Sequence, residues 1–440
     1  MARVLVLATT TGYQTRAFGE AAARLGVELV FATDRCHLIE DPWQDHAVPI
    51  RFYDEDASVA AILDAARGRP IDGVLVVGDR PTVIGARVAE ALGLPFHSAE
   101  AAAIARHKQR TRECLRHAGL LAPWWFPIAL GEPSALPPGP LTYPCVLKPV
   151  SLSGSRGVMR ADNEAELAAA LDRLRAIVRS PDVRAERNEA HDSALLEGFI
   201  SGREYALEGL MHHGDLHVLA IFDKPDPLDG PFFEETIYVT PSAASESVER
   251  AIVEGVSRAA AAMGLGHGPI HAECRVNAEG VFVLEVAARP IGGLCARSLR
   301  FSRIPNPQFL IPDSQSLIPL EELLLRHALG EAPTWRREVN ASGVMMIPIP
   351  KRGILRSVEG LDAARQVPGI VDAQITAKMD QRLLPLPEGA SYLGFLFARA
   401  DRAAAVEDAL RAAHRRLHFA IDPEFPVLDM SQIHYNLHHG

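Results

Sequence analysis

Two glutamates that face each other on a predicted β-hairpin are the residues of this sequence best suited to chemistry. The segment 268–293 is predicted to form two strands joined by a three-residue loop, with Gly280 at the left-handed position. In that register Glu273 lies directly opposite Glu285, and like charges so placed destabilise a sheet. A cation between them would remove the repulsion, and carboxylate oxygens are the ligands that Mg²⁺ prefers. The hairpin therefore predicts a magnesium site, and the alternative is a solvated hairpin with ordinary surface acids.

Further polar residues follow the same hairpin. His271 precedes the first glutamate by two residues, so the two-residue period of a strand places both side chains on one face. Arg289 follows the second glutamate by four residues, and Gly292-Gly293 lets a backbone approach a ligand closely. A satisfied core histidine explains His271 equally well.

A lysine and the loop that follows it could bind an anion. Lys148 lies inside the apolar run YPCVLKPV, where a lysine is costly unless it meets an anion or reaches water. The next residues, 151–158, read SLSGSRGV and do not form a Walker P-loop. They could still fold over a triphosphate, with backbone N–H groups and serine hydroxyls as donors. A flexible hairpin turn is the alternative for this loop.

Composition limits the class of protein. At 440 residues the chain is too long for one core, so several domains are expected. The net charge of −10 argues against a nucleic-acid partner, because these totals require no basic face. The five cysteines are scattered and form no CxxC, which favours reduced thiols in a cytoplasmic protein over disulfides or a zinc site. No apolar run approaches the length of a membrane span.

The N-terminal third predicts a parallel sheet covered by helices. Apolar runs at 3–8 and 27–33 flank a helical pattern, which is typical of a βαβ unit. A single glycine follows the first strand, so a nicotinamide cofactor is not supported. Asp79 and Arg80 end a later strand, where open α/β sheets bind ligands, although a solvated loop is at least as good an explanation.

The rest of the chain mixes helices and strands. A helix is predicted over 164–178, followed by an exposed, mobile insertion over 180–193. Residues 302–317 are loop-like. From residue 341 a β-rich segment begins, and a helix over 403–417 closes it. This last part is predicted to be a small α+β unit that covers one end of the central domain.

Taken in order, these features resemble the ATP-grasp superfamily from the first strand to about residue 417. The resemblance implies an α/β and α+β multidomain fold. Its parts would be a Rossmann-like pre-ATP-grasp domain, a small ATP-grasp subdomain with the glycine-rich loop, a large subdomain with the metal site, and a C-terminal β-rich lid-like unit. The corresponding boundaries are 1–105, 106–192, 193–335 and 336–440.

The resemblance also implies an ATP site. Two lysines would contact the phosphates, and the serine- and glycine-rich loop would close over them. Glu197 and the residues after it match the hinge that holds the adenine, and Glu204 matches the acid that binds the ribose hydroxyls. The residues implied for ATP are Lys108, Lys148, Ser153, Gly154, Ser155, Gly157, Glu197, Phe199, Ile200 and Glu204.

For the metal and the chemistry, the resemblance points to the hairpin. Glu273 and Glu285 match ligands of Mg²⁺, with Mn²⁺ as an alternative ion, while Arg289 and His271 match residues beside the reacting carboxylate. Many ATP-grasp enzymes have an asparagine ligand where this chain has Ala287, so one magnesium ion would take water or a phosphate oxygen instead. This E-x-A-A-R form is similar to the L-amino acid ligases of the bacilysin-synthetase type and to carnosine synthase.

The implied activity is an ATP- and Mg²⁺-dependent carboxylate–amine ligase that forms an amide or peptide bond through an acyl phosphate, joining amino acids. Other ATP-grasp ligases or carboxylases, of the biotin-carboxylase or purine-biosynthesis type, and a non-catalytic ATP-binding module are the alternatives. Residues 225–238 are the candidate for part of the acceptor site, and no general base stands out. No nucleic-acid or membrane partner is expected, and a homodimer is suggested by the resemblance alone.

Overall fold

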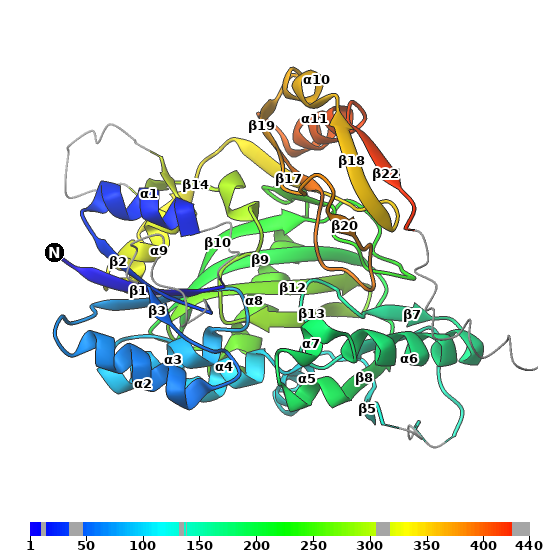
Figure 1. Cartoon of the computed structure of the whole chain (residues 1–440), viewed down its shortest axis with the longest axis horizontal. Coiled ribbons are helices and arrows are strands. Elements are labelled where there is room, and N and C mark those ends of the chain that lie inside the picture. Colours follow the sequence, from blue (N-terminus) through cyan, green and yellow to red (C-terminus); the bar gives the residue numbers. More distant parts are fainter. Residues whose placement is uncertain (10–14, 35–46, 132–135, 138, 305–316, 425–440) are drawn as a thin grey trace, which may run out of the picture.

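A large central β-sheet holds the units of this protein together. The computed structural model describes residues 1–9, 15–34, 47–131, 136–137, 139–304 and 317–424. These residues form five sheets, of which the largest has eight strands. In Figure 1 this sheet lies at the centre, with the N-terminal α/β unit at the left, residues 125–198 at the lower right and the C-terminal unit at the top.

The N-terminal unit is the predicted parallel sheet, in the order β3-β2-β1-β4. Its strands are β1 (Arg3–Ala8), β2 (Glu28–Thr33), β3 (Val48–Pro49) and β4 (Gly73–Val77). Strands β1 and β4 are almost wholly buried because helices cover both faces of the sheet. These helices are α1 (Thr15–Leu25) and α9 (Leu320–Ala328) on one face, and α2 (Glu55–Ala66) and α3 (Thr82–Leu92) on the other.

The small sheet has the order β5-β8-β6-β7 and is antiparallel. Its strands are β5 (Trp125–Ala129), β6 (Cys145–Pro149), β7 (Met159–Ala161) and β8 (Ser193–Gly198). Helix α6 (Glu164–Val178) begins after the N-cap Asn163 and buries its apolar side against this sheet. It covers the predicted range residue for residue. Helices α4 (Ala99–Ala105) and α5 (Lys108–His117) lead into this unit.

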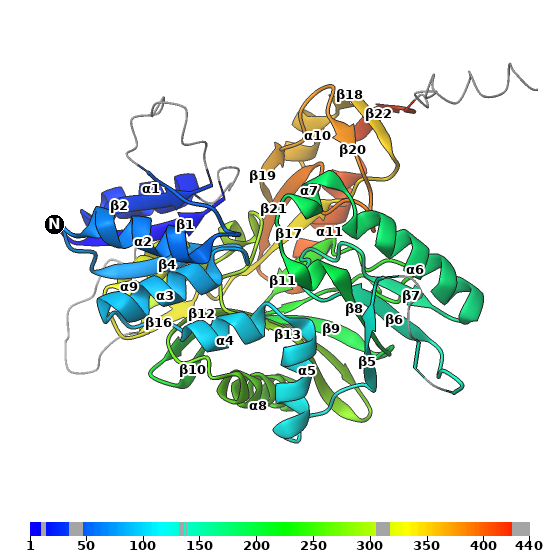
Figure 2. The ribbon, with the colours of Figure 1, turned by 60° about the horizontal axis from the view of Figure 1, so that its bottom comes forward.

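The large sheet has the order β13-β12-β9-β10-β11-β17-β21-β19. Its first five strands in the chain are β9 (Arg203–His212), β10 (Asp215–Asp223), β11 (Ile237–Thr240), β12 (Gly268–Asn277) and β13 (Gly280–Ala287). Helix α8 (Glu246–Met263) packs on one face of these strands, below the sheet in Figure 2. The opposite face is left for the C-terminal unit and for the candidate site.

The C-terminal unit continues this sheet and does not merely cover its end. Strand β17 (Ala341–Ile347) pairs with β11, and β21 (Gly394–Ala400) and β19 (Ile370–Ile375) follow. The predicted α+β unit therefore shares a sheet with the central domain. Sequence patterns do not indicate the pairing of β11 with β17, because it joins residues about a hundred positions apart. Helix α11 (Ala403–His414) packs on β17 and β21.

Two small sheets complete the fold. One, β20-β18-β22, belongs to the C-terminal unit, and the other, β15-β14-β16, lies between the large sheet and α9. Their strands are β14 (Arg300–Arg303), β15 (Ile318–Pro319), β16 (Trp335–Arg337), β18 (Gly353–Glu359), β20 (Arg382–Leu383) and β22 (His418–Asp422). Most of the predicted loop 302–317 lies outside the described residues.

The β12–β13 hairpin pairs Glu273 with Glu285 as predicted, but by a different route. Asn277 pairs with Gly280, so the turn has two residues and the predicted three-residue loop is wrong. A bulge at Leu284 restores the register, because it adds the residue that the shorter turn removes. Without this bulge one of the two glutamates would point to the other face of the sheet.

The segment 180–193 is folded, although half of its residues are exposed, as its polar composition predicts. It forms α7 (Pro181–Arg184) and a 3-10 turn over Glu189–Asp192, and it buries Val183 and His191. The two ring nitrogens of His191 lie 3.1 Å from Ser151 Oγ and 3.0 Å from a Glu186 carboxylate oxygen. The segment thus supports the beginning of the serine- and glycine-rich loop.

Within the described ranges, no helix combines the length and apolar character needed to cross a membrane. The four cysteines in those ranges are free thiols, namely Cys114, Cys145, Cys274 and Cys295. Burial raises the pKa of Cys145 to about 11 and that of Cys295 to about 12. These two are therefore unreactive thiols at neutral pH.

The contact between β4 and α9 gives a test of how the N-terminal sheet is held. A Cβ atom on Gly73 would lie 2.6 Å from the carbonyl oxygen of Ala328. We expect Gly73→Ala to push α9 off the sheet and to lower the free energy of unfolding by about 1–3 kcal/mol. Gly68→Ala is the matched control, because nothing lies within 4 Å of the added Cβ. Equal urea midpoints for the two variants, measured by circular dichroism, would contradict this packing.

Candidate active site

A cavity of about 580 Å³ lies where the N-terminal, small-sheet, large-sheet and C-terminal units meet. Every predicted site residue except Gly157 lines it. These residues are Lys108, Lys148, Ser153, Gly154, Ser155, Glu197, Phe199, Ile200, Glu204, His271, Glu273, Glu285 and Arg289. Residues that are far apart in the sequence are thereby brought to one place.

Gly157 holds the base of the glycine-rich loop and does not face the cavity. Its N–H donates to the carbonyl of Pro387 at 2.9 Å, and a Cβ here would lie 2.9 Å from the Leu174 side chain. Its φ of 75° is in the left-handed region that favours glycine. The tip of the loop also approaches the C-terminal unit, since a Cβ on Gly154 would lie 3.4 Å from Ala390. The loop is thus hydrogen-bonded to the C-terminal unit at its base and lies close to that unit at its tip.

Lys148 meets a carboxylate inside the small sheet, which explains its place in an apolar strand. It forms an ion pair with Glu197, and Arg112 Nε donates to the same carboxylate at 2.9 Å. Burial lowers the pKa of Lys148 to about 8, against the opposing effect of Glu197. Burial would raise the pKa of Glu197, but Arg112 and Lys148 hold it at about 2. The lysine charge at neutral pH therefore depends on its carboxylate neighbour.

Arg112 also connects this pair to the hairpin, a role that the sequence did not suggest. Its Nη1 donates to the carbonyl of Leu284 at 2.8 Å, at the bulge of β13. The side chain is 1% exposed, so the guanidinium is fully committed to these contacts. One buried arginine thus links the small sheet to the hairpin that bears the facing glutamates.

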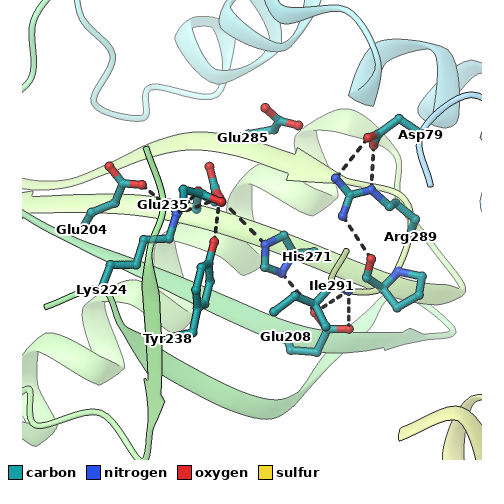
Figure 3. A network of polar contacts seen from close by, with 12 residues as sticks. Asp79, Glu204, Glu208, Lys224, Glu235, Tyr238, His271, Glu285, Arg289 and Ile291 are labelled. Carbon is teal, nitrogen blue, oxygen red and sulfur yellow. Dashed lines mark hydrogen bonds and ion pairs between the residues drawn. The ribbon is translucent and has the colours of Figure 1, made fainter. Parts of the chain in front are cut away.

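Lys224 is the main cavity residue that sequence reasoning missed. Its ammonium lies 2.8 Å from both Glu204 and Glu273 and also contacts Glu235 (Figure 3). These three carboxylates raise the pKa of Lys224 well above its usual value although burial opposes them. Lys224 follows the apolar run in LAIFDKP, which is compatible with a buried lysine. A lysine at the end of a strand is also typical of a solvated residue, so the sequence did not distinguish the two.

The three carboxylates around Lys224 lie close together. Their oxygens approach within 4.8 Å of one another, and Arg275 Nε donates to Glu204 at 2.9 Å. Burial and the charge of Glu273 raise the pKa of Glu235 to about 8. Although burial opposes it, Lys224 holds the pKa of Glu273 well below its usual range. The ion pair with Lys224 therefore favours the ionised form of Glu273, whereas burial favours the protonated form of Glu235.

Glu285 faces the cavity from the neighbouring strand. Its side chain is 31% exposed, and the nearest ammonium, that of Lys108, lies 3.9 Å away. Lys108 itself donates to the carbonyl of Leu152 at 2.7 Å, next to the loop. The two facing glutamates thus have different lysine neighbours. Glu273 forms a close ion pair with Lys224, whereas Glu285 lies at a longer distance from Lys108.

His271 is both a satisfied buried histidine and a cavity residue. Its Nδ1 lies 3.1 Å from a carboxylate oxygen of Glu208, which also accepts the N–H of Ile291 at 3.1 Å. Burial raises the pKa of Glu208. The other ring nitrogen, Nε2, points towards Glu273 at 3.9 Å. Glu208 therefore fixes the direction of the imidazole, which the alternating strand pattern alone did not define.

Arg289 pairs with the N-terminal unit. Its Nε and Nη2 donate to the two carboxylate oxygens of Asp79 at 2.7 and 3.1 Å, and its Nη1 donates to the Pro290 carbonyl at 3.0 Å (Figure 3). Burial opposes the charge of Asp79, but Arg289 holds its pKa below the usual value. Asp79 follows β4, so the carboxyl end of the parallel sheet does contribute to the cavity.

Two further segments contribute aromatic side chains to the wall of the cavity. Leu228, Phe233, Glu235 and Tyr238 belong to the range 225–238, which was predicted to contribute. Tyr392 and Phe395 come from the C-terminal unit and were not predicted. Their sequence context, YLGFLF, is that of an ordinary buried strand, so no local signal marked them.

Comparisons with known proteins agree with this arrangement. The family described as ATP-grasp domain matches residues 141–298, the ATP-grasp N-terminal domain matches 19–96, and the L-amino acid ligase C-terminal domain 2 matches 345–422. The solved L-amino acid ligase from Bacillus licheniformis superposes with a TM-score of 0.77 at 26% identity. That similarity covers 96% of this chain and 99% of the other.

Curated relatives are more distant or longer. An uncharacterized protein, y4rH, of Sinorhizobium fredii is 24% identical over 98% of this chain and 86% of its own length. The alanine–anticapsin ligase of Bacillus subtilis is 27% identical over 57% of this chain and 54% of its own length. Carnosine synthase 1 of Homo sapiens is 26% identical over 56% of this chain and 30% of its own length. The matched part of this chain thus spans about half or less of the two named ligases.

The Lys224 cluster gives a prediction about stability. We expect Lys224→Met to lower the free energy of unfolding by about 3–5 kcal/mol, because it leaves buried carboxylates without their shared cation. Lys351→Met removes an exposed lysine and is the control, with an expected change within about 0.5 kcal/mol. Urea unfolding followed by circular dichroism measures both. A Lys224→Met protein as stable as the control would show that the three carboxylates do not need the ammonium.

Proposed function

Because the chain belongs to the ATP-grasp family, we propose that it is an ADP-forming ligase that joins two amino acids through an amide bond. The observation that carries this proposal is the convergence of two facing glutamates, two lysines and one arginine on a single cavity. The relatives named as L-amino acid and alanine–anticapsin ligases support amino acids as substrates.

We propose that the nucleotide lies between the small and large sheets. Lys108 and Lys148 would contact its phosphates, and the backbone of the loop at Ser153–Ser155 would close over them. Phe199 and Ile200 follow β8 and line the cavity, where they would hold the adenine, and Glu204 would accept from the ribose hydroxyls. Glu197 would act mainly through Lys148, since its carboxylate already receives two cations.

The hairpin residues fit a magnesium ion. Glu273 and Glu285 lie opposite each other, both line the cavity, and their side chains are 22% and 31% exposed. Their oxygens are the hard donors that Mg²⁺ binds together with substrate phosphates. When bound, the ion would neutralise the charge on the phosphoryl oxygens. Ala287 offers no further ligand, so the nucleotide or water would complete the coordination.

The proposed reaction has two steps. The carboxylate of the first amino acid attacks the γ-phosphorus of ATP, so that an acyl phosphate forms and ADP leaves. The amine of the second amino acid then attacks the acyl carbon, releases phosphate and loses a proton. The lysines position the phosphates in line, which is most of what phosphoryl transfer requires. The loop, tied to the C-terminal unit, keeps water from the acyl phosphate.

The second step places negative charge on the acyl oxygen, and Arg289 is positioned to stabilise it. Asp79 and the Pro290 carbonyl use three of its five N–H groups, which leaves two for a substrate. Nη1 lies beside Gly292, where the absence of a side chain lets a ligand come close. The Asp79 pair fixes the guanidinium before the substrate arrives, which is how such donors stabilise charge at little reorganisation cost.

A substrate screen tests the function. Purified protein with ATP and Mg²⁺ is incubated with pairs of amino acids, and ADP, phosphate and dipeptide mass are measured. We expect ADP and phosphate to form only with a suitable pair, in step with a dipeptide. Glu285→Gln should reduce the rate by at least about a hundredfold with an unchanged circular dichroism spectrum, because it removes a metal ligand. ATP turnover that needs bicarbonate, or no substrate at all, would contradict the proposal.

The lowered pKa of Lys148 predicts a pH dependence of ATP affinity. Lys148 carries its charge below about pH 8 and loses it above, so the Kd for ATP should rise severalfold between about pH 7 and about pH 9. Lys148→Arg keeps the charge throughout this range and should make the affinity nearly independent of pH. Titration of both proteins by calorimetry measures the difference. Parallel pH profiles would mean that Lys148 does not titrate against the phosphates.

A further inference from the structure

A second group of metal-ligating side chains lies outside the cavity, at the turn between β9 and β10. His212, His267 and His327 bring one ring nitrogen each within 4.8 Å of one another. His212 ends β9, His267 immediately precedes β12, and His327 lies in the last turn of α9. None of the three lines the cavity described above. The cluster is therefore separate from the proposed ligase site.

The backbone fixes the first two histidines beside each other. His212 pairs with Asp215 across a two-residue turn, His213-Gly214, whose φ angles of 52° and 94° are both left-handed. The N–H of Gly214 donates to the carbonyl of Gly266 at 2.8 Å. This bond holds the turn against the loop that carries His267. The sequence HHGDLH is a histidine-rich tract of the kind that binds metals.

The spacing of the rings is close to that of a metal site. His212 Nδ1 lies 3.1 Å from His327 Nε2. The His267 ring centroid lies 4.4 Å from that of His327 and 5.3 Å from that of His212. Two imidazole nitrogens on a tetrahedral zinc ion, each about 2.0–2.1 Å from it, lie about 3.3–3.4 Å apart. Small side-chain rotations, including an unstacking of His267 from His327, would bring the three nitrogens to that distance.

One ring nitrogen of the cluster, His267 Nδ1, is buried without a hydrogen-bond partner among the described residues. His267 is 7% exposed. A buried polar atom without a partner is unfavourable, so such atoms are uncommon unless a ligand satisfies them. The neighbouring rings of His212 and His327 face this ring on the inside of the cluster.

His213 gives the cluster a way to solvent. It is exposed, and its ring centroid lies 4.5 Å from that of His212 and 5.1 Å from that of His267. It could supply a fourth ligand, or a water could take that position. A metal ion could therefore enter from solvent without opening the core.

We propose that His212, His267 and His327 bind a transition-metal ion, zinc or a divalent ion of similar preference. Imidazole nitrogens favour such ions, whereas the carboxylates of the cavity favour Mg²⁺. Helix α9 packs on α1 and β4 of the N-terminal unit, whereas His212 ends strand β9 of the large sheet and His267 precedes strand β12. The bound ion would thus connect the large sheet to the N-terminal unit, and its role would be structural. This proposal does not depend on the ligase activity.

Metal titration of the full chain tests the site. The protein is stripped with a chelator and titrated with Zn²⁺ by calorimetry in excess Mg²⁺, which keeps the carboxylates occupied. We expect one equivalent to bind and the thermal midpoint to rise. His212→Asn should weaken binding at least about tenfold to a hundredfold, because it removes a ligand, while His117→Asn, at an exposed histidine of α5, should not change it. Co²⁺ in place of zinc should give the visible absorption bands of a tetrahedral nitrogen site.

His212 is half-buried, so its replacement should leave the fold intact, and His267→Asn then tests the buried ligand. The proposal fails if no Zn²⁺ binds at micromolar concentration. It also fails if His212→Asn and His117→Asn bind equally well, or if excess Mg²⁺ abolishes binding, since these results would place the ion elsewhere.

Discussion

Repulsion between carboxylates is the constraint on which the cavity depends. Glu273 and Glu285 are held opposite each other by strand register, and Glu204 and Glu235 approach Glu273 from neighbouring segments. Inside the protein this arrangement is unstable unless cations balance it. Lys224 contacts three of the four acids, and Lys108 lies only loosely beside the fourth. The side that faces the cavity therefore keeps negative charge, which favours a divalent ion delivered with a nucleotide.

The same cavity requires all units to be in contact, because each unit supplies one partner of an ion pair or hydrogen bond to another unit. The N-terminal sheet gives Asp79 to Arg289 of the large sheet, and the loop of the small sheet bonds through Gly157 to Pro387 of the C-terminal unit. Arg112 joins the small sheet to the bulge on the hairpin. Displacement of any unit would thus break either an ion pair or a backbone hydrogen bond. Such coupling suits a reaction whose acyl phosphate must be kept from water.

The sequence predicted the elements that depend on local patterns and the charged residues that lie within apolar strands. The helix 164–178 and the parallel N-terminal sheet are confirmed, because both follow from periodicity. The pairing of the facing glutamates is also confirmed, although it is produced by a two-residue turn and a bulge at Leu284 that were not predicted. The pairing of β11 with β17 and the cluster around Lys224 were missed, since they depend on contacts between segments distant in the sequence. For the polar stretch 180–193, composition predicts the exposed residues but not the buried His191, whose partners it does not reveal.

The two proposed cation sites differ in a way that should keep their ions apart. In the cavity the candidate metal ligands are carboxylate oxygens, which favour a hard ion. The ammonium of Lys224 already contacts one of these carboxylates and competes with the ion. We therefore expect a divalent ion to bind there together with the phosphate oxygens of the nucleotide. In the histidine cluster the donors are imidazole nitrogens, which suit softer ions than Mg²⁺. A zinc ion held at the histidines would therefore not compete with catalysis. It would instead fix α9, and through it the N-terminal sheet whose Asp79 orients Arg289.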